Sequence, residues 1–113
     1  MALSKEYLDA LGKSPFATWF DDLHPPAAAK VKTAITRLEH GNASNVKSVG
    51  SGVSERIVDF GPGYRIYFGK DGDEIIILLG GGEKDGQQRD IELAITRWKD
   101  YKKKKKEEAD ATD

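Results

Sequence analysis

The residues best suited to chemistry in this sequence are a set of polar and charged side chains spread over positions 47 to 88. The set is Lys47, Glu55, Arg56, Arg65, Tyr67, Lys84 and Gln88. Arg65 and Tyr67 alternate with apolar neighbours, so both belong to one face of a half-buried strand. A three-strand meander would bring the strand that carries Glu55 beside them. The sequence therefore predicts a mixed cluster of cations, a carboxylate and a phenol.

Such a cluster can accelerate one reaction without metal or histidine. RNA cleaves itself when a 2′-hydroxyl attacks the neighbouring phosphate, and a protein assists by aligning the attack, stabilising the charged intermediate and moving protons. Arg65 suits the charge because its planar fork matches phosphate oxygens. We expect Lys47 and Lys84 to hold flanking phosphates and Glu55 or Tyr67 to transfer protons. The alternative is an ordinary cross-strand ion pair between arginine and glutamate.

Other kinds of site are poorly supported by the sequence. There is no cysteine, and the two histidines, His24 and His40, have no partner at ligand spacing, so we expect no metal and no cofactor. The same residues argue against a Ser-His-Asp or Cys-His arrangement. The glycines 80 to 82 lack the following lysine and Ser or Thr of a phosphate-binding loop. Trp19 and Trp98 each stand at helical spacing from other apolar residues of a predicted helix, which favours a core role over base stacking.

Length and charge limit the class of protein to which this chain can belong. A chain of 113 residues fits one domain, which we place at residues 1–101, and no apolar run is long enough to span a membrane. Those residues carry 13 Lys and Arg against 15 Asp and Glu, a net charge of −2. No basic field therefore draws the domain onto nucleic acid, and RNA contact would need a local cluster or a larger assembly. We expect a cytoplasmic protein.

The elements that position the cluster follow from periodicity and turn residues. We expect strands at 5–12, 53–60, 64–68 and 75–79, and helices at about 14–23, 27–40 and 87–101. Residues 42–52 are turn formers and are predicted to be a loop, and the glycines from position 80 are predicted to end the last strand. Residues 102–113, with five consecutive lysines, are predicted to be a disordered charged tail. The fold class is α+β, with an antiparallel-dominated four-stranded sheet, a two-helix hairpin and a C-terminal helix, in the order β-α-α-β-β-β-α.

Several motifs together resemble a known family. They are Gly41-Asn42, Lys47 to Gly50, Gly52-Val53, Glu55, GPGYRIYF at 61–68, LLGGG-E-K at 78–84, QQ-x-DI at 87–91, and Trp98. The pattern is similar to the addiction-module killer proteins, the phage-derived, HigB-like branch of the RelE/ParE toxin superfamily. The resemblance extends from Tyr7 to Tyr101.

The resemblance implies a RelE-like toxin of a bacterial type II toxin-antitoxin system, paired with a helix-turn-helix antitoxin. Many relatives are metal-independent endoribonucleases that cut mRNA on the translating ribosome. By motif, Lys47, Glu55, Arg65, Lys84 and Gln88 correspond to the family pattern. The alternatives are a non-enzymatic toxin that binds DNA gyrase, as in the ParE branch, and a degenerate toxin that acts only as the antitoxin's partner.

One arginine departs from the family pattern. The family commonly has Glu-x-Arg-Ile, whereas this chain has Glu55-Arg56-Ile57-Val58. We place Arg56 with Lys47 and Gln88 among the RNA-binding candidates. Because strand side chains alternate between faces, however, the shift predicts that Arg56 points away from Glu55. The catalytic set is then Arg65, Lys84, Glu55 and Tyr67, with Arg65 and Lys84 carrying most of the activity.

Overall fold

The structure, a computed structural model that describes residues 1–111, is an α+β fold built on one mixed sheet. Its elements in chain order are β1 (Leu3–Glu6), α1 (Pro15–Asp21), α2 (Pro25–Glu39), β2 (Val46–Gly50), β3 (Val53–Val58), β4 (Tyr64–Asp71), β5 (Ile75–Glu83) and α3 (Gln87–Ala111). The strands lie in the order β1-β5-β4-β3-β2. Neighbours β2 to β5 pair antiparallel, and β1 runs parallel to β5. The predicted meander is therefore confirmed.

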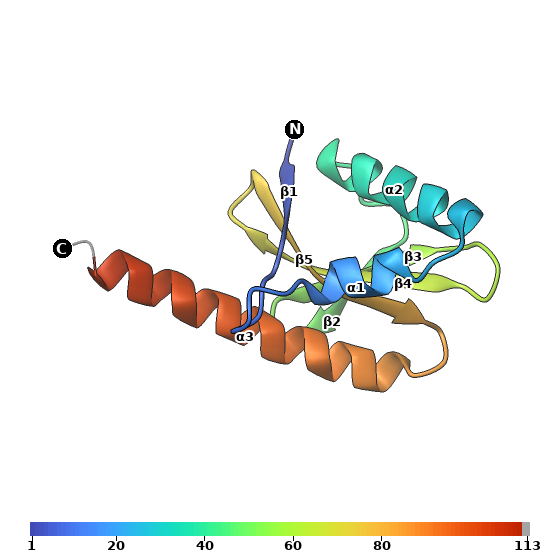
Figure 1. Cartoon of the computed structure of the whole chain (residues 1–113). Helices are drawn as coiled ribbons and strands as arrows, with labels where there is room; N and C mark the ends of the chain where they lie inside the picture. The colour runs from blue at the N-terminus through green and yellow to red at the C-terminus, as the bar shows by residue number, and fades with distance from the viewer. Residues whose placement is uncertain (112–113) are drawn as a thin grey trace.

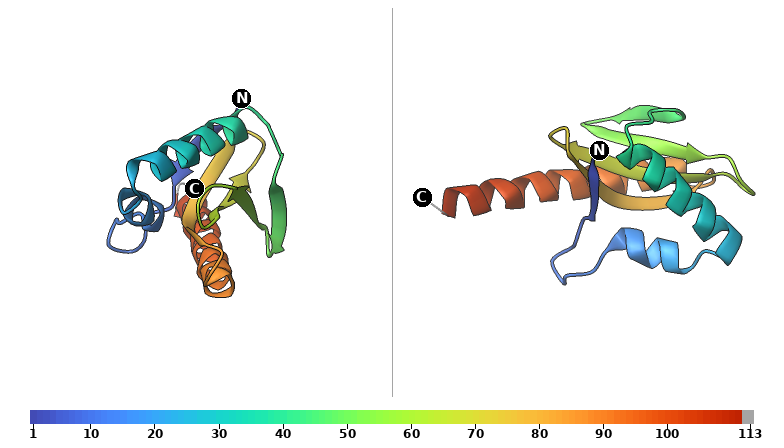
Figure 2. Two further views of the ribbon diagram at one scale, coloured as in Figure 1. Left: turned by 90° about the vertical axis from the view of Figure 1, so that its right-hand side faces the viewer. Right: turned by 90° about the horizontal axis from the view of Figure 1, so that it is seen from above.

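The sheet has helices on both faces (Figure 1). One face packs against α1 and α2, and its core includes Phe16, Val31, Leu38, Ile66 and Phe68. The other face packs against α3 through Val53, Tyr67, Ile77, Leu79, Ala94 and Trp98. Alternation along each strand therefore sends neighbouring residues into two different cores. The end-on view in Figure 2 shows the sheet between the two helical layers.

The first helix starts where its capping signal places it, whereas the second begins at Pro25, two residues before the predicted start at position 27. The Ser14 hydroxyl accepts a hydrogen bond from the Ala17 amide at 3.0 Å, and Pro15 occupies the first turn of α1. Pro25 does the same for α2, whose buried stripe is Ala27, Val31, Ala34 and Leu38. Both predicted helices are present, and they connect within a few residues as a hairpin.

The prediction of four strands is wrong, because residues 42–52 contain the fifth strand, β2. Among residues 1–111 it pairs with β3 alone, and Lys47 lies opposite Glu55. As an edge strand it is mostly exposed, with Val46 and Val49 half-buried. Hydrogen bonds to β3 therefore hold it, and the apolar pattern by which a strand is recognised is nearly missing. The predicted strand at 5–12 is also largely wrong, because β1 spans Leu3–Glu6 and overlaps the prediction only at residues 5 and 6.

The glycines at 80 to 82 do not end β5, which continues to Glu83. They allow close packing on both faces instead: a Cβ at Gly81 would lie 2.3 Å from the Trp19 ring, and one at Gly82 would lie 2.1 Å from an Asp90 carboxylate oxygen. Glycine inside a strand often marks such a close approach. The triplet therefore belongs to β5, and Gly81 leaves room for the Trp19 ring against the strand.

The predicted disordered tail is helical as far as Ala111, and its last two residues lie outside the described chain. Lysine, glutamate and alanine are good helix formers, so α3 continues past Tyr101. Tyr101 donates a hydrogen bond to Asp71 at 2.6 Å, Lys105 pairs with the same carboxylate, and Lys104 pairs with Asp100 at 2.9 Å. The C-terminal half of α3 projects beyond the sheet (Figures 1 and 2).

Candidate functional site

The sheet face that packs against α3 brings several of the predicted site residues together. Lys47 on β2 pairs opposite Glu55 on β3, and Glu55 pairs opposite Tyr67 on β4. Arg65 is two residues from Tyr67 and pairs opposite Ile57 and Gly82. These side chains share one face because each belongs to the same phase of its strand. We call Lys47, Glu55, Arg65 and Tyr67, with Gln87 at the start of α3, the α3-face cluster.

A buried ion pair lies at the centre of the cluster. The Arg65 Nε is 3.4 Å from Glu55 Oε2, and the two side chains are 11% and 5% exposed. The contact is an ion pair without a hydrogen bond at Nε, which has no hydrogen-bond partner among residues 1–111. Glu55 receives its hydrogen bonds from Gln87, whose Nε2 lies 3.0 Å from Oε2 and 3.3 Å from Oε1. The cross-strand pairing predicted as the alternative is therefore present.

Tyr67 forms the floor of the cluster. It is 1% exposed, and its hydroxyl has no hydrogen-bond partner within residues 1–111. Burial, followed by the negative charges of Glu55 and Asp90, raises the pKa of Tyr67. The phenol therefore stays protonated at neutral pH, so it can donate a proton but is not a base.

Lys84 lies at the edge of this face, in the exposed turn between β5 and α3. Its backbone amide donates to the Gly63 carbonyl at 3.1 Å, which ties the turn to the start of β4. Lys47 is also exposed. The accessible part of the cluster is therefore cationic, and its carboxylate lies beneath.

Two predicted residues lie elsewhere. Arg56 points to the opposite face, as its shifted position predicts, and donates a hydrogen bond to the Ser44 carbonyl. Gln88 is exposed on α3 and bonds Glu92, at 3.4 Å, so the glutamine that reaches the cluster is its neighbour Gln87. The sequence indicates Gln88 rather than Gln87, because it does not fix the rotation of the helix about its axis. Which of two adjacent glutamines faces the sheet therefore cannot be predicted.

Asp90 and Arg97 are two further charged residues on this side that sequence reasoning passed over. Burial raises the pKa of Asp90. Burial also lowers the pKa of Arg97, whose Nη1 donates to the Leu79 carbonyl at 3.0 Å. Both belong to the helical stripe of α3, and spacing from the buried Ala94 was the signal that could have found them.

Residues 1–111 contain no group of three His, Cys, Asp or Glu that could hold a metal ion. None of the helices in this part of the chain is long and apolar enough to cross a membrane.

Comparison with known proteins gives a family but no activity. No family model matches the chain. A protein from Haemophilus influenzae is 40% identical over 80 residues, which cover 70% of this chain and 81% of that protein. It is described only as an uncharacterized protein. The chain belongs to the same family as this Haemophilus protein.

Proposed function

We propose that this member of the family is the toxin of a bacterial type II toxin-antitoxin pair, and that it cleaves mRNA on the ribosome. One observation carries the proposal: Lys47 and Arg65 lie on the same sheet face around Glu55, at the end where α3 begins. Three residues of the motifs that resemble the HigB-like killer proteins, Lys47, Glu55 and Arg65, belong to this face. The α+β fold, with helices on both sides of the sheet, supports its assignment as RelE-like.

In this proposal the cluster acts on one phosphodiester. The 2′-oxygen attacks phosphorus, the bond from phosphorus to the 5′-oxygen breaks, and the products are a cyclic phosphate and a 5′-hydroxyl. Arg65 stabilises the charge on the phosphate oxygens, and the exposed Lys47 and Lys84 hold flanking phosphates. Glu55 orients Arg65 and accepts the proton of the 2′-hydroxyl, and a solvent water gives a proton to the departing 5′-oxygen. Tyr67 supports the pair from below.

The partners of the proposed reaction follow from its setting. The full chain has a net charge of −1, so a phosphate surface does not attract it strongly. A ribosome that already positions the mRNA would supply the missing contacts. A helix-turn-helix antitoxin would neutralise the protein in the cytoplasm.

A non-enzymatic toxin that binds DNA gyrase is the second candidate. The observation that favours it is the ion pair itself. The Glu55 carboxylate, 3.4 Å from the Arg65 guanidinium, already offsets part of the positive charge that would attract a phosphate. In that case the same face would serve protein binding, and substitutions there would change toxicity without any RNA cut.

The test is controlled expression in a bacterial host, with mapping of new mRNA 5′ ends. The variants are Lys47→Ala and Lys84→Ala, because both residues are exposed and their loss leaves the core intact. Lys99→Ala, exposed on α3, is the matched control. We expect the parent and the control to arrest growth and to produce cuts at defined codons, and each test variant to lower cleavage about tenfold or more.

Growth arrest with DNA-damage signalling and no new mRNA ends would replace the ribonuclease by the gyrase-binding toxin. Full cleavage by the double variant Lys47→Ala, Lys84→Ala would remove these lysines from the proposed site. Absence of any toxicity in the parent, at an expression level verified by immunoblot, would refute both toxin proposals.

A further inference from the structure

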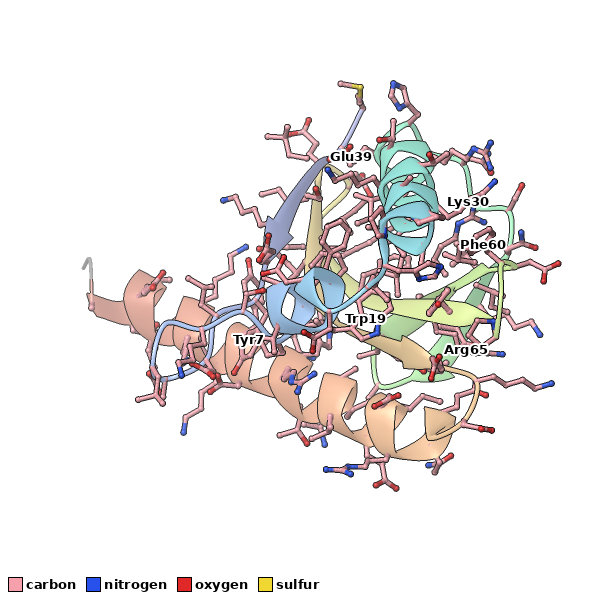
Figure 3. All side chains as sticks on the ribbon, turned by 45° about the vertical axis from the view of Figure 1, so that its right-hand side comes forward. Tyr7, Trp19, Lys30, Glu39, Phe60 and Arg65 are labelled. Atoms are coloured by element: carbon pink, nitrogen blue, oxygen red, sulfur yellow. The ribbon has the colours of Figure 1, made fainter. Side chains whose placement is uncertain are left out.

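A second cluster of cations lies on the other face of the sheet, around a cavity that the proposed ribonuclease does not use. The cavity has a volume of about 240 Å³. Lys30 and Arg37 line it from α2, and Asn45, Arg56, Asp59 and Phe60 line it from β3 and the segments on either side of that strand. Figure 3 shows Lys30 beside Phe60 on the α2 side, with Arg65 lying toward α3. We call this space the α2 cavity.

Arg56 is the deepest cation of the α2 cavity. The residue is 4% exposed, and one guanidinium nitrogen donates to the Ser44 carbonyl. Its Nε is buried and has no hydrogen-bond partner within the described residues 1–111. A buried donor left without a partner is costly, more so when it carries charge. Arg56 therefore brings a buried positive charge with an unused donor to the lining of the α2 cavity.

Arg37 adds to that cost. Burial, and then the positive charge of Arg37, lowers the pKa of Arg56. Lys30 lies 5.7 Å above the centre of the Phe60 ring, at the rim of the same space. With Asp59 as the one carboxylate among the lining residues, the lining carries three positive charges against one negative. Its net charge of +2 matches a doubly charged anion.

We propose that the α2 cavity binds the dianion of a phosphate monoester group, with Arg56 and Arg37 as its principal ligands. The planar guanidinium fork suits phosphate oxygens, and an anion here would neutralise the two arginines together. A carboxylate would supply half the charge. A long nucleic-acid strand is disfavoured because the chain has no net positive charge to track its backbone. Inorganic phosphate and the terminal phosphate of a nucleotide share the required chemistry.

The proposal is tested by NMR titration of the full chain, observing the arginine Nε–H resonances. The probes are inorganic phosphate, adenosine monophosphate and acetate, at constant ionic strength and at a pH above the second phosphate pKa of about 6. The variants are Arg37→Gln, which is exposed on α2, and the control Lys32→Gln, which is exposed on the same helix outside the cavity. Amide spectra verify that each variant is folded.

We expect both phosphate probes to shift the Arg56 resonance saturably, with affinity about tenfold lower in Arg37→Gln and changed by less than about twofold in Lys32→Gln. Equal affinity for the two phosphate probes identifies the phosphate group alone as the ligand; tighter binding of adenosine monophosphate identifies a nucleotide. The proposal is overturned if acetate binds as tightly, if no probe saturates, or if Arg37→Gln binds like the parent. The α2 cavity is on the face opposite Lys47 and Arg65, so none of these results depends on ribonuclease activity.

Discussion

The ion pair between Glu55 and Arg65 offers the sharpest test of how the α3-face cluster is held. The change is Glu55→Gln, which keeps the shape of the side chain and removes its charge. Arg65, with a side chain 11% exposed, would then keep its positive charge without a partner. Gln87 would also lose one of its two acceptors, since both Glu55 oxygens now receive its amide.

The size of the change in the free energy of unfolding follows from the distance between the two charged groups. At 3.4 Å and an effective dielectric constant of about 20, the attraction between the two charges is about 5 kcal/mol before desolvation is counted. Desolvation of two nearly buried groups offsets most of this, so a net coupling of about 1–3 kcal/mol is expected. Leaving one charge buried alone costs more than the pair is worth. We therefore expect Glu55→Gln to lower the free energy of unfolding by about 3 kcal/mol.

The measurement is urea unfolding followed by tryptophan fluorescence, because Trp98 is buried under the same sheet face. A double-mutant cycle with Arg65→Met isolates the pair, and Glu83→Gln at the exposed end of β5 is the control for the chemical change. The control should stay within about 0.5 kcal/mol of the parent. If Glu55→Gln does so too, or if the two single changes simply add in the double variant, the ion pair does not stabilise the fold and this reasoning is wrong.

Two further predictions concern packing and pH. Gly69→Ala places a Cβ 2.6 Å from the Trp98 ring, so we expect a loss of about 1–3 kcal/mol in the free energy of unfolding, measured by urea titration; unchanged stability would contradict the observed packing. Stability should also fall on both sides of neutrality in a pH series of thermal unfolding. Hydrogen bonds from Lys105 and Tyr101 lower the pKa of Asp71, so its contribution is present above the ordinary value of 3.8 and is lost as pH falls below it. Burial and the Asp71 bond raise the pKa of Tyr101 to about 12, so that contribution is complete below 10.0 and is lost as pH rises toward 12. Asp71→Asn should flatten the acid limb, and an acid limb identical to that of the parent would refute the assignment.

The parts of the fold that the sequence predicts correctly are those whose elements bury a periodic apolar face. The meander from Val53 to Leu79 and the hairpin of α1 and α2 are of this kind. The strand β2 is missed because its pairing comes from β3, and backbone hydrogen bonds leave no trace in side-chain patterns. The α3 extension is missed because its contact with the sheet is ionic: Lys105 pairs with Asp71, 34 residues earlier in the chain.

The same distinction separates the predicted from the unpredicted parts of the site. Strand alternation suffices to place Glu55, Arg65 and Tyr67 on one face, and the structure has them there. Alternation does not predict how deeply a side chain is buried. Glu55 and Tyr67 are buried because α3 covers this face of the sheet. The α2 cavity is beyond sequence reasoning for a related reason: Arg37 and Arg56 meet only when a helix crosses a strand 19 positions later.

The adjacency of Glu55 and Arg56 gives the two faces of β3 different electrostatic roles. In the same strand, Glu55 offsets the charge of Arg65 on one side, while Arg56 lies near Arg37 on the other and forms no salt bridge within residues 1–111. Side chains at adjacent strand positions point to opposite faces, so an arginine at position 57 instead of 56 would place its positive charge on the face that packs against α3. The cluster facing α3 is then left with a neutral centre and exposed lysines. The face under α2 has a cavity with net positive charge. The distribution of charge between the two faces therefore depends on whether the arginine stands at one position of β3 or the next.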